Sequence, residues 1–98
     1  MTTAAIVGYI AAVFSVTAFT PQAWRIIKTR DTSSLSTPMW ILEVFAFGAW
    51  IAYGVLLGEL PIIVTNTICG LIALFILVMK VAPRRTKEKI ADAIDPAA

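Results

Sequence analysis

The 98-residue sequence contains no histidine and only one cysteine. A single cysteine, Cys69, excludes a disulfide bond within the chain, and its apolar surroundings indicate a small core residue. Without histidine, and without a carboxylate pair or Cys/His cluster at metal-ligand spacing, we expect no metal and no other cofactor. The chain also lacks a nucleophile–base pair and a phosphate-binding loop, so nothing in it indicates an enzyme.

Charge is scarce as well. Charged residues make up 14% of the chain, against about 25% in ordinary soluble domains, whereas hydrophobic residues make up 59%. A soluble fold of this size could not bury so much apolar surface, so we expect one domain embedded in a lipid bilayer. Three apolar runs predict an all-α membrane protein with three transmembrane helices, at about residues 4–27, 38–57 and 61–81. Residues 84–98 are polar, and we expect a disordered tail that forms at most a short, frayed surface helix.

The basic residues fall into two groups, one near the end of the first run and one after the third. They are Arg25, Lys28 and Arg30 in the first group, and Lys80, Arg84, Arg85, Lys87 and Lys89 in the second. The N-terminus and the turn at residues 58–60 have none. The positive-inside rule therefore predicts an outside N-terminus with a cytoplasmic first loop and C-terminus, which an odd number of spans satisfies.

A proline interrupts the first run at Pro21-Gln22. Pro21 has no amide hydrogen and its ring clashes with the carbonyl of Thr17, so a helix through it must bend. Hydroxyls in this half of the run can bond carbonyls that the bend frees. A kinked helix leading into a short basic turn is typical of a hinge in a moving membrane protein, although a static kink is the more common role.

Trp50 and Asn66 lie in the outer half of the predicted bundle. Trp24 and Trp40 lie near the cytoplasmic ends of their helices, where membrane tryptophans are usual, but Trp50 lies about two turns from Gly58. Asn66 lies at a comparable depth, where a carboxamide needs partners. Together they suit a sugar, whose C–H face stacks on indole while its hydroxyls pair with the amide. The alternatives are a packing tryptophan and an asparagine that joins helices.

Glu43 is the only ionisable residue well inside a predicted span, which makes it a functional candidate. It could couple transport to protons, or it could be an interfacial carboxylate paired with Arg25 or Lys28. Its depth of about one turn favours the second role.

Three helices alone cannot enclose a water-filled path with satisfied polar walls. Any transport would therefore need an oligomer, most simply a two-fold dimer. The basic stretch at residues 84–89 leaves another class open, a non-transporting membrane adaptor whose tail sits on anionic headgroups.

The order and spacing of the motifs resemble the bacterial SemiSWEET sugar transporters of the SWEET and PQ-loop superfamily. The motifs are Pro21-Gln22, Thr29-Arg30-Asp31-Thr32-Ser33-Ser34-Leu35-Ser36, Trp50-Ile51-Ala52-Tyr53-Gly54 and Asn66, within residues 4 to about 83. The resemblance implies a parallel homodimer of three-helix bundles, with the third helix between the first two. It also implies passive, uniport movement of mono- or disaccharides across the bacterial inner membrane by alternating access. As in amino-acid-exporting PQ-loop relatives, a proton-coupled carrier of another small solute is the alternative that Glu43 prompts.

The resemblance also implies roles for single side chains and for partners. It implies Trp50 and Asn66 at the sugar, Pro21 and Gln22 at the hinge, and Phe19 and Met39 near the cytoplasmic gate. The expected partners are a sugar of the glucose or sucrose class, a second copy of the chain and the lipid bilayer, with no nucleic acid.

At the outer gate the resemblance is incomplete. Several family members close this gate with a tyrosine and an Arg–acid pair across the dimer. Tyr53 and Glu59 are present here, but Leu57 stands where the arginine would be. Closure is therefore expected to rest on Tyr53 and apolar contact. Glu43 lies outside the family pattern, which leaves its charge role open.

Overall fold

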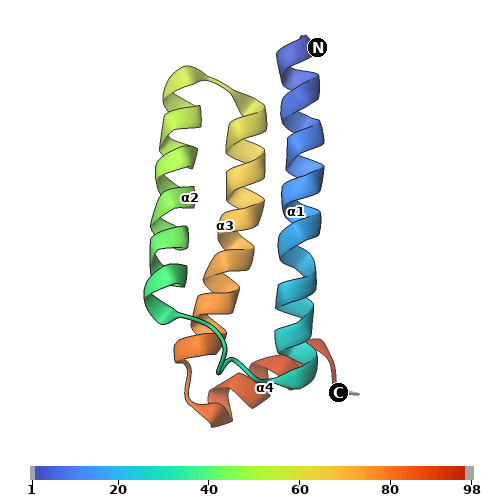
Figure 1. Cartoon of the computed structure of the whole chain (residues 1–98), viewed down its shortest axis with the longest axis vertical. Helices are drawn as coiled ribbons and strands as arrows, with labels where there is room; N and C mark the ends of the chain where they lie inside the picture. The colour runs from blue at the N-terminus through green and yellow to red at the C-terminus, as the bar shows by residue number, and fades with distance from the viewer. Residues whose placement is uncertain (1, 97–98) are drawn as a thin grey trace.

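The computed structural model describes residues 2–96, which form four helices. These are α1 (Thr3–Thr29), α2 (Thr37–Leu57), α3 (Leu60–Val81) and α4 (Arg84–Ile94). The first three are long and apolar enough to cross a membrane, so the predicted all-α fold with three candidate spans is confirmed. Helix α3 packs against both α1 and α2 and lies between them (Figure 1).

Local sequence signals set the ends of the helices. The Thr2 hydroxyl accepts a hydrogen bond from the Ala5 amide and caps α1. Ser36 caps α2 in the same way, and a proline occupies the first turn of both α2 and α3. Gly58 ends α2 with a φ of 70°, a left-handed conformation that glycine adopts without strain. These signals make α2 and α3 a tight hairpin.

Helix α1 continues through Pro21 to Thr29. Proline has no amide hydrogen, so the helix loses one backbone hydrogen bond, the one that the carbonyl of Thr17 would accept. The nearby Thr20 hydroxyl donates to the carbonyl of Val16 at 2.6 Å, and not to the carbonyl that Pro21 frees. Pro21 thus removes a backbone hydrogen bond of α1 without ending the helix.

The core follows α3 toward the basic end of the bundle, the end where α1 carries Arg25, Lys28 and Arg30. Ala73, Ile76 and Met79 of α3 are fully buried there. Trp40 of α2 joins them with only 2% of its surface exposed, so it belongs to the core and not to a headgroup-facing belt. The position of Trp40 in the sequence predicts its depth along the helix, but not the direction in which its ring packs.

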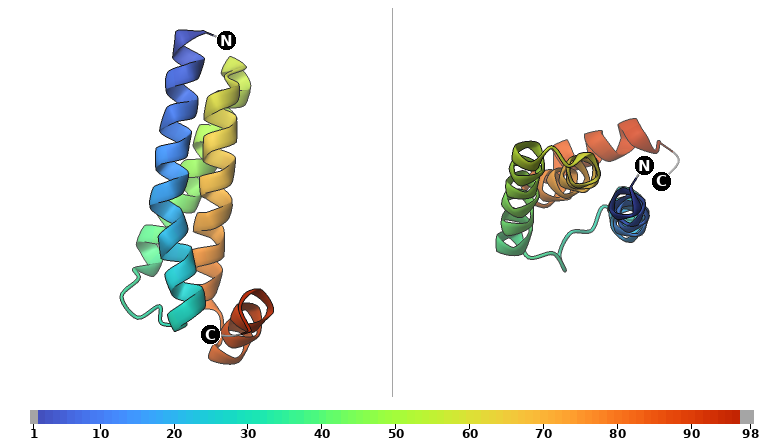
Figure 2. Two further views of the ribbon diagram at one scale, coloured as in Figure 1. Left: turned by 90° about the vertical axis from the view of Figure 1, so that its right-hand side faces the viewer. Right: turned by 90° about the horizontal axis from the view of Figure 1, so that it is seen from above.

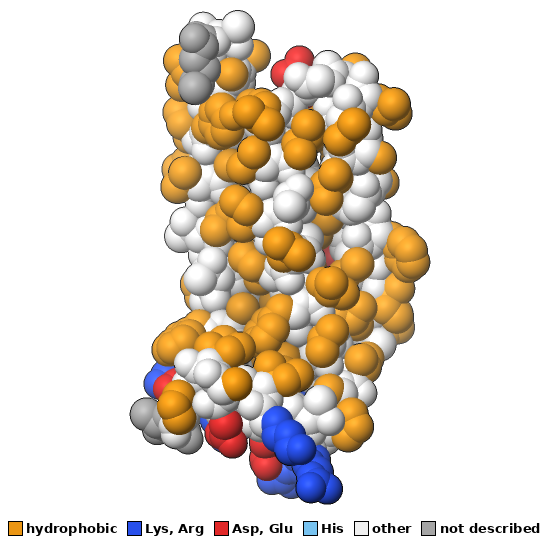
Figure 3. All heavy atoms as spheres, turned by 180° about the vertical axis from the view of Figure 1, so that it is seen from behind, with side chains coloured by type: hydrophobic (Ala, Val, Ile, Leu, Met, Phe, Trp, Pro, Cys, Tyr) orange, Lys and Arg blue, Asp and Glu red, His pale blue; other side chains and the backbone are white. Residues whose placement is uncertain are grey.

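Hydrophobic side chains cover much of the outer surface of the bundle, and lysine and arginine side chains gather at one end (Figure 3). Many large apolar side chains on α1, α2 and α3 are exposed. An apolar outer surface fits helices that face lipid.

Residues 84–94 form a helix, where the sequence predicts a disordered tail with at most a short, frayed surface helix. Helix α4 crosses the basic end of the bundle (Figure 2). Ala91 is fully buried and Ile90 packs against the core. Lys28 Nζ lies 2.6 Å from Asp95 Oδ2, and another ion pair joins the end of α1 to α4. Overall composition does not show that this segment has one apolar face, or that its acidic residues lie opposite the basic end of α1.

Candidate functional site

Trp50 and Asn66 line the same cavity, of about 290 Å³, as the sequence analysis expects from their similar depth. The cavity lies near the turn end of the bundle, where the short turn at Gly58 joins α2 to α3. Its other walls come from α1 and α3, and its full lining is Gly8, Ala11, Trp50, Pro61, Ile62, Thr65 and Asn66. We call it the Trp50 cavity.

Trp50 presents a largely open indole. Its side chain is 52% exposed, and its ring meets Tyr53 edge to face, with centroids 5.5 Å apart and planes at 85°. A second hollow, lined by Ala46, Ala49, Trp50 and Tyr53, borders the same indole. Tyr53 is itself 49% exposed. The contact fixes the indole from its edge and leaves ring surface free for a ligand.

Asn66 is half-buried, and its Nδ2 donates to the carbonyl of Ile62 at 2.8 Å. A carboxamide has two N–H donors and an accepting oxygen, so this bond uses only part of its capacity. The neighbouring Thr65 hydroxyl donates to the carbonyl of Pro61 at 2.6 Å. Both side chains are thereby held against α3, while Asn66 keeps groups that can bond a ligand.

Gly8 allows α1 to approach α3 at the edge of the Trp50 cavity. A Cβ atom placed on Gly8 would lie 2.8 Å from Pro61 Cβ, which is closer than packed side chains come. Gly54 of α2 makes a similar approach to α3, at Ile62. Sequence reasoning did not select Gly8, because alanines lie about one helical turn away on both sides and a glycine among small residues does not stand out.

An aromatic cluster lies farther toward the basic end. Phe19 of α1 meets Trp40 and Phe47 of α2 edge to face, with ring centroids 6.1 Å and 5.6 Å apart. These contacts link α1 to α2 beside the central α3. Met39, the other residue expected near this gate, is 47% exposed at the start of α2.

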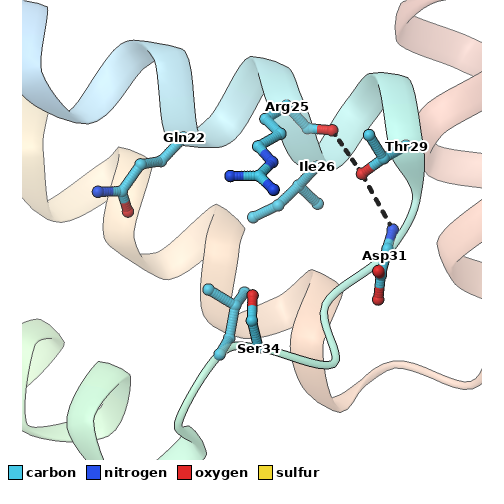
Figure 4. A pocket seen from close by; sticks show the side chains of 7 residues that line it. Gln22, Arg25, Ile26, Thr29, Asp31 and Ser34 are labelled. Carbon is cyan, nitrogen blue, oxygen red and sulfur yellow. Dashed lines mark hydrogen bonds between the residues drawn. The ribbon is translucent and has the colours of Figure 1, made fainter.

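A second cavity of about 310 Å³ lies beyond the aromatic cluster, between α1 and the loop that follows it (Figure 4). We call it the Arg25 cavity, and its lining is Gln22, Arg25, Ile26, Thr29, Asp31, Ser34 and Leu35. Gln22 therefore faces a cavity, whereas its neighbour Pro21 is exposed and does not line it.

Hydrogen bonds hold the loop beside this cavity. The Thr29 hydroxyl donates to the Arg25 carbonyl at 2.8 Å and accepts from the Asp31 amide at 3.3 Å. Asp31 Oδ1 accepts from the Ser33 amide at 2.9 Å. Hydrogen bonds from the side chain and backbone of Ser33 hold the pKa of Asp31 below its usual value. Asp31 is therefore a charged acceptor near neutral pH.

The two acidic candidates lie apart from both cavities. Glu43 is half-buried, and within residues 2–96 no salt bridge reaches it. Lys28, one of its two expected partners, pairs with Asp95 instead. Glu59 is exposed at the start of α3 and makes no capping hydrogen bond with its side chain, and Leu57 is exposed nearby.

The fold and the Pro21-Gln22 segment together define a class, the small three-span PQ-loop membrane proteins. The family model described as PQ loop repeat matches residues 3–63. The sugar transporter SemiSWEET of Bradyrhizobium diazoefficiens is 36% identical over 75 residues, 76% of this chain and 87% of that protein. SemiSWEET of Escherichia coli is 33% identical over 88 residues, 90% of this chain and 99% of that protein.

A solved structure of SemiSWEET in the inward-open conformation matches with a TM-score of 0.78 and 32% identity. The match covers 92% of this chain and 97% of that one. The chain belongs to the SemiSWEET family, within the PQ-loop superfamily. It is a family of transporters and not of enzymes, in agreement with the lack of any catalytic motif.

Proposed function

We propose that this protein is a facilitative sugar transporter, a uniporter that moves mono- or disaccharides by alternating access as a parallel homodimer. The observation that carries the proposal is that Trp50 and Asn66, on different helices, line one cavity. The names of the relatives support sugar as the substrate class.

The chemistry of the Trp50 cavity suits a sugar. An exposed indole offers an apolar face to sugar C–H groups, and a carboxamide with free donor and acceptor groups pairs with hydroxyls. The remaining lining is small or apolar, apart from the Thr65 hydroxyl, which already bonds its own helix. Small-molecule sites usually have this arrangement, a mostly apolar pocket with a few polar groups.

A second copy of the chain would complete the path. In one protomer the indole of Trp50 remains 52% exposed, and three helices cannot enclose a polar route through a bilayer. A parallel, two-fold dimer would bring two such cavities to one axis. The distribution of basic residues supports placing the basic end in the cytoplasm and the N-terminus outside, in the inner membrane of a bacterium.

Gating in this proposal uses the residues on either side of the Trp50 cavity. Along α1, Phe19 lies between the residues of the Trp50 cavity and those of the Arg25 cavity, so its cluster with Trp40 and Phe47 would form the inner closure. Tyr53 would form the outer one, with apolar contact where Leu57 replaces a charged partner. The hinge at Pro21 would let the basic end of α1 move.

Counterflow in proteoliposomes tests the proposal. Vesicles preloaded with unlabelled glucose or sucrose should trap the labelled sugar with no ion gradient imposed. Trp50→Ala and Asn66→Ala should each lower the rate about tenfold, which corresponds to about 1.4 kcal/mol. The matched control is Trp24→Ala, because Trp24 is 49% exposed but lines neither cavity.

The control should keep its counterflow rate. Normal transport by both cavity variants, in protein shown to be folded and dimeric, would remove the site assignment. Absence of trapping by the unsubstituted protein with either sugar would remove the sugar uniporter itself.

The position of Glu43 favours a second candidate, a proton-coupled carrier of another small solute. A half-buried carboxylate that makes no ion pair among the described residues has no cation committed to it, which is the arrangement that a proton-coupled carrier needs. Under uniport, we expect Glu43→Gln to leave counterflow intact and a pH gradient to drive no accumulation. Glu59→Gln, which alters an exposed carboxylate, is the matched control. Accumulation driven by a pH gradient and lost only in Glu43→Gln would replace the uniporter.

A further inference from the structure

We propose that the Arg25 cavity is a second sugar subsite, which holds a single hexose ring at the cytoplasmic entrance of the path. This inference rests on the proposed function, because it assigns a further position to the same substrate. The cavity shares no lining residue with the Trp50 cavity.

The lining supplies three planar polar groups: the Gln22 carboxamide, the Arg25 guanidinium and the Asp31 carboxylate, whose Oδ1 also accepts from the loop amide of Ser33. Such groups match adjacent hydroxyls of a sugar, and the Ser34 hydroxyl adds a donor and acceptor. Opposite charges on Arg25 and Asp31 cancel, which favours a neutral polyol over an anion. Figure 4 shows these side chains surrounding one space, from α1 and from the loop.

The three basic residues at this end of α1 differ in whether they form ion pairs. Lys28 pairs with Asp95, and Arg30 Nη2 lies 2.7 Å from Asp92 Oδ1, so both are held by α4 and the residue after it. No salt bridge to Arg25 occurs within the described chain. Its guanidinium faces the cavity with its hydrogen-bonding capacity available.

Apolar groups complete the subsite. Ile26 is buried and Leu35 is half-buried, and both line the cavity beside the polar groups. A hexose has a C–H face as well as hydroxyls, so it needs both kinds of surface. The volume of about 310 Å³ lies at the lower end of the roughly 300–1,000 Å³ of small-molecule sites and is enough for one sugar ring.

The position of the subsite follows from the spacing on α1. Ala11, Phe19, Gln22 and Ile26 recur at helical spacing and share one face. A sugar that leaves the Trp50 cavity past Phe19 would therefore meet Gln22 and Arg25 next. The bonds through Thr29 and Asp31 hold the loop in place before any ligand arrives.

Protection from thiol labelling tests the subsite. Ser34→Cys would place a thiol in the cavity of the purified full chain, and glucose should slow its reaction with a maleimide severalfold. The unsubstituted chain gives the background, since Cys69 is only 1% exposed. Thr86→Cys on the exposed surface of α4 is the matched control, which glucose should not protect. Betaine at equal concentration controls for a non-specific solute effect.

Two further variants separate the subsite from the transport site. Protection should persist when Trp50→Ala is added to Ser34→Cys, because the two cavities share no residue. It should be lost when Arg25→Ala, or Asp31→Ala as an independent second variant, is added. A labelling rate of Ser34→Cys that glucose does not change overturns the subsite. Protection that is lost when Trp50→Ala is added also overturns it, because the labelling rate would then report a movement caused by sugar in the Trp50 cavity. Counterflow by the unsubstituted protein is scored separately, so failure of the subsite and failure of the sugar uniporter give different results.

Discussion

Trp24 and Trp50 are almost equally exposed, at 49% and 52%, but their surroundings differ. Lys28 Nζ lies 5.1 Å from the centre of the Trp24 ring, a cation–π contact suited to the membrane boundary. Trp50 instead shares a cavity with the Asn66 carboxamide. The two indoles therefore differ in the groups that they face and not in their exposure, and the proposed sugar site uses the one that faces a carboxamide.

Gly8 and Gly48 allow a matched test of close packing around the site. Gly8→Ala should destabilise the protein by about 1–3 kcal/mol, because its Cβ would meet Pro61 Cβ at 2.8 Å. Gly48→Ala should be neutral or stabilising by up to about 1 kcal/mol, since an added Cβ would meet no described atom within 4 Å apart from its chain neighbours and the adjoining backbone of α2, and alanine favours helix. The measurement is the unfolding midpoint in detergent. Equal effects of the two substitutions would contradict the close approach.

Single residues were predictable from sequence to different degrees. Trp50 and Asn66 could be brought together because helix rise fixes depth, and their distances from the Gly58 turn predict similar depths. The contact between Gly8 and Pro61 could not be predicted, because it depends on how closely two helices pack. Burial of Trp40 also escaped prediction, since depth along a helix does not say which neighbour its side chain meets.

At the scale of elements, the three apolar helices can be predicted from the sequence more easily than α4. Long apolar runs indicate membrane helices with little dependence on tertiary contacts. An 11-residue polar helix is marginal alone and gains its stability by docking. Here docking uses the buried Ala91 together with Lys87, which donates to the Thr32 hydroxyl at 2.9 Å. The sequence therefore allowed a short helix at these residues but did not predict that it docks onto the bundle.

Ion pairs between α1 and the C-terminal segment should hold α4 in place. In a variant combining Asp92→Asn with Asp95→Asn, we expect α4 amides to exchange hydrogen severalfold faster, because two pairs worth roughly 0.2–1 kcal/mol each are lost. The control is Glu88→Gln, which removes the exposed pair with Arg84 inside α4. Hydrogen exchange followed by mass spectrometry measures both. Equal exchange in the two variants would show that apolar contact alone docks α4.

At the scale of the whole molecule, the proposed dimer predicts a specific response to mixed subunits. Reconstituting equal amounts of unsubstituted and Trp50→Ala chains should leave about one third of the counterflow rate if both subunits must be intact, because about one quarter of the dimers are unsubstituted and the rest keep about a tenth of their rate. Independent protomers would retain slightly more than about one half. Reconstitution after mixing in detergent, with Trp24→Ala chains as the matched partner, measures the difference. A rate of one half would contradict a path shared between two subunits.

Apolar contacts pack the helices at both ends of the bundle, but among the described residues ion pairs contribute at only one of them. At the end with the Gly58 turn, the close approach of α1 to α3 at Gly8 does not respond to dissolved ions. At the other end, ion pairs of partly exposed side chains join α1 to the C-terminal segment, and salt screens such pairs. A rise in ionic strength therefore loosens the molecule at one end only, so the salt content of the surrounding compartment acts selectively on the end that carries Arg25.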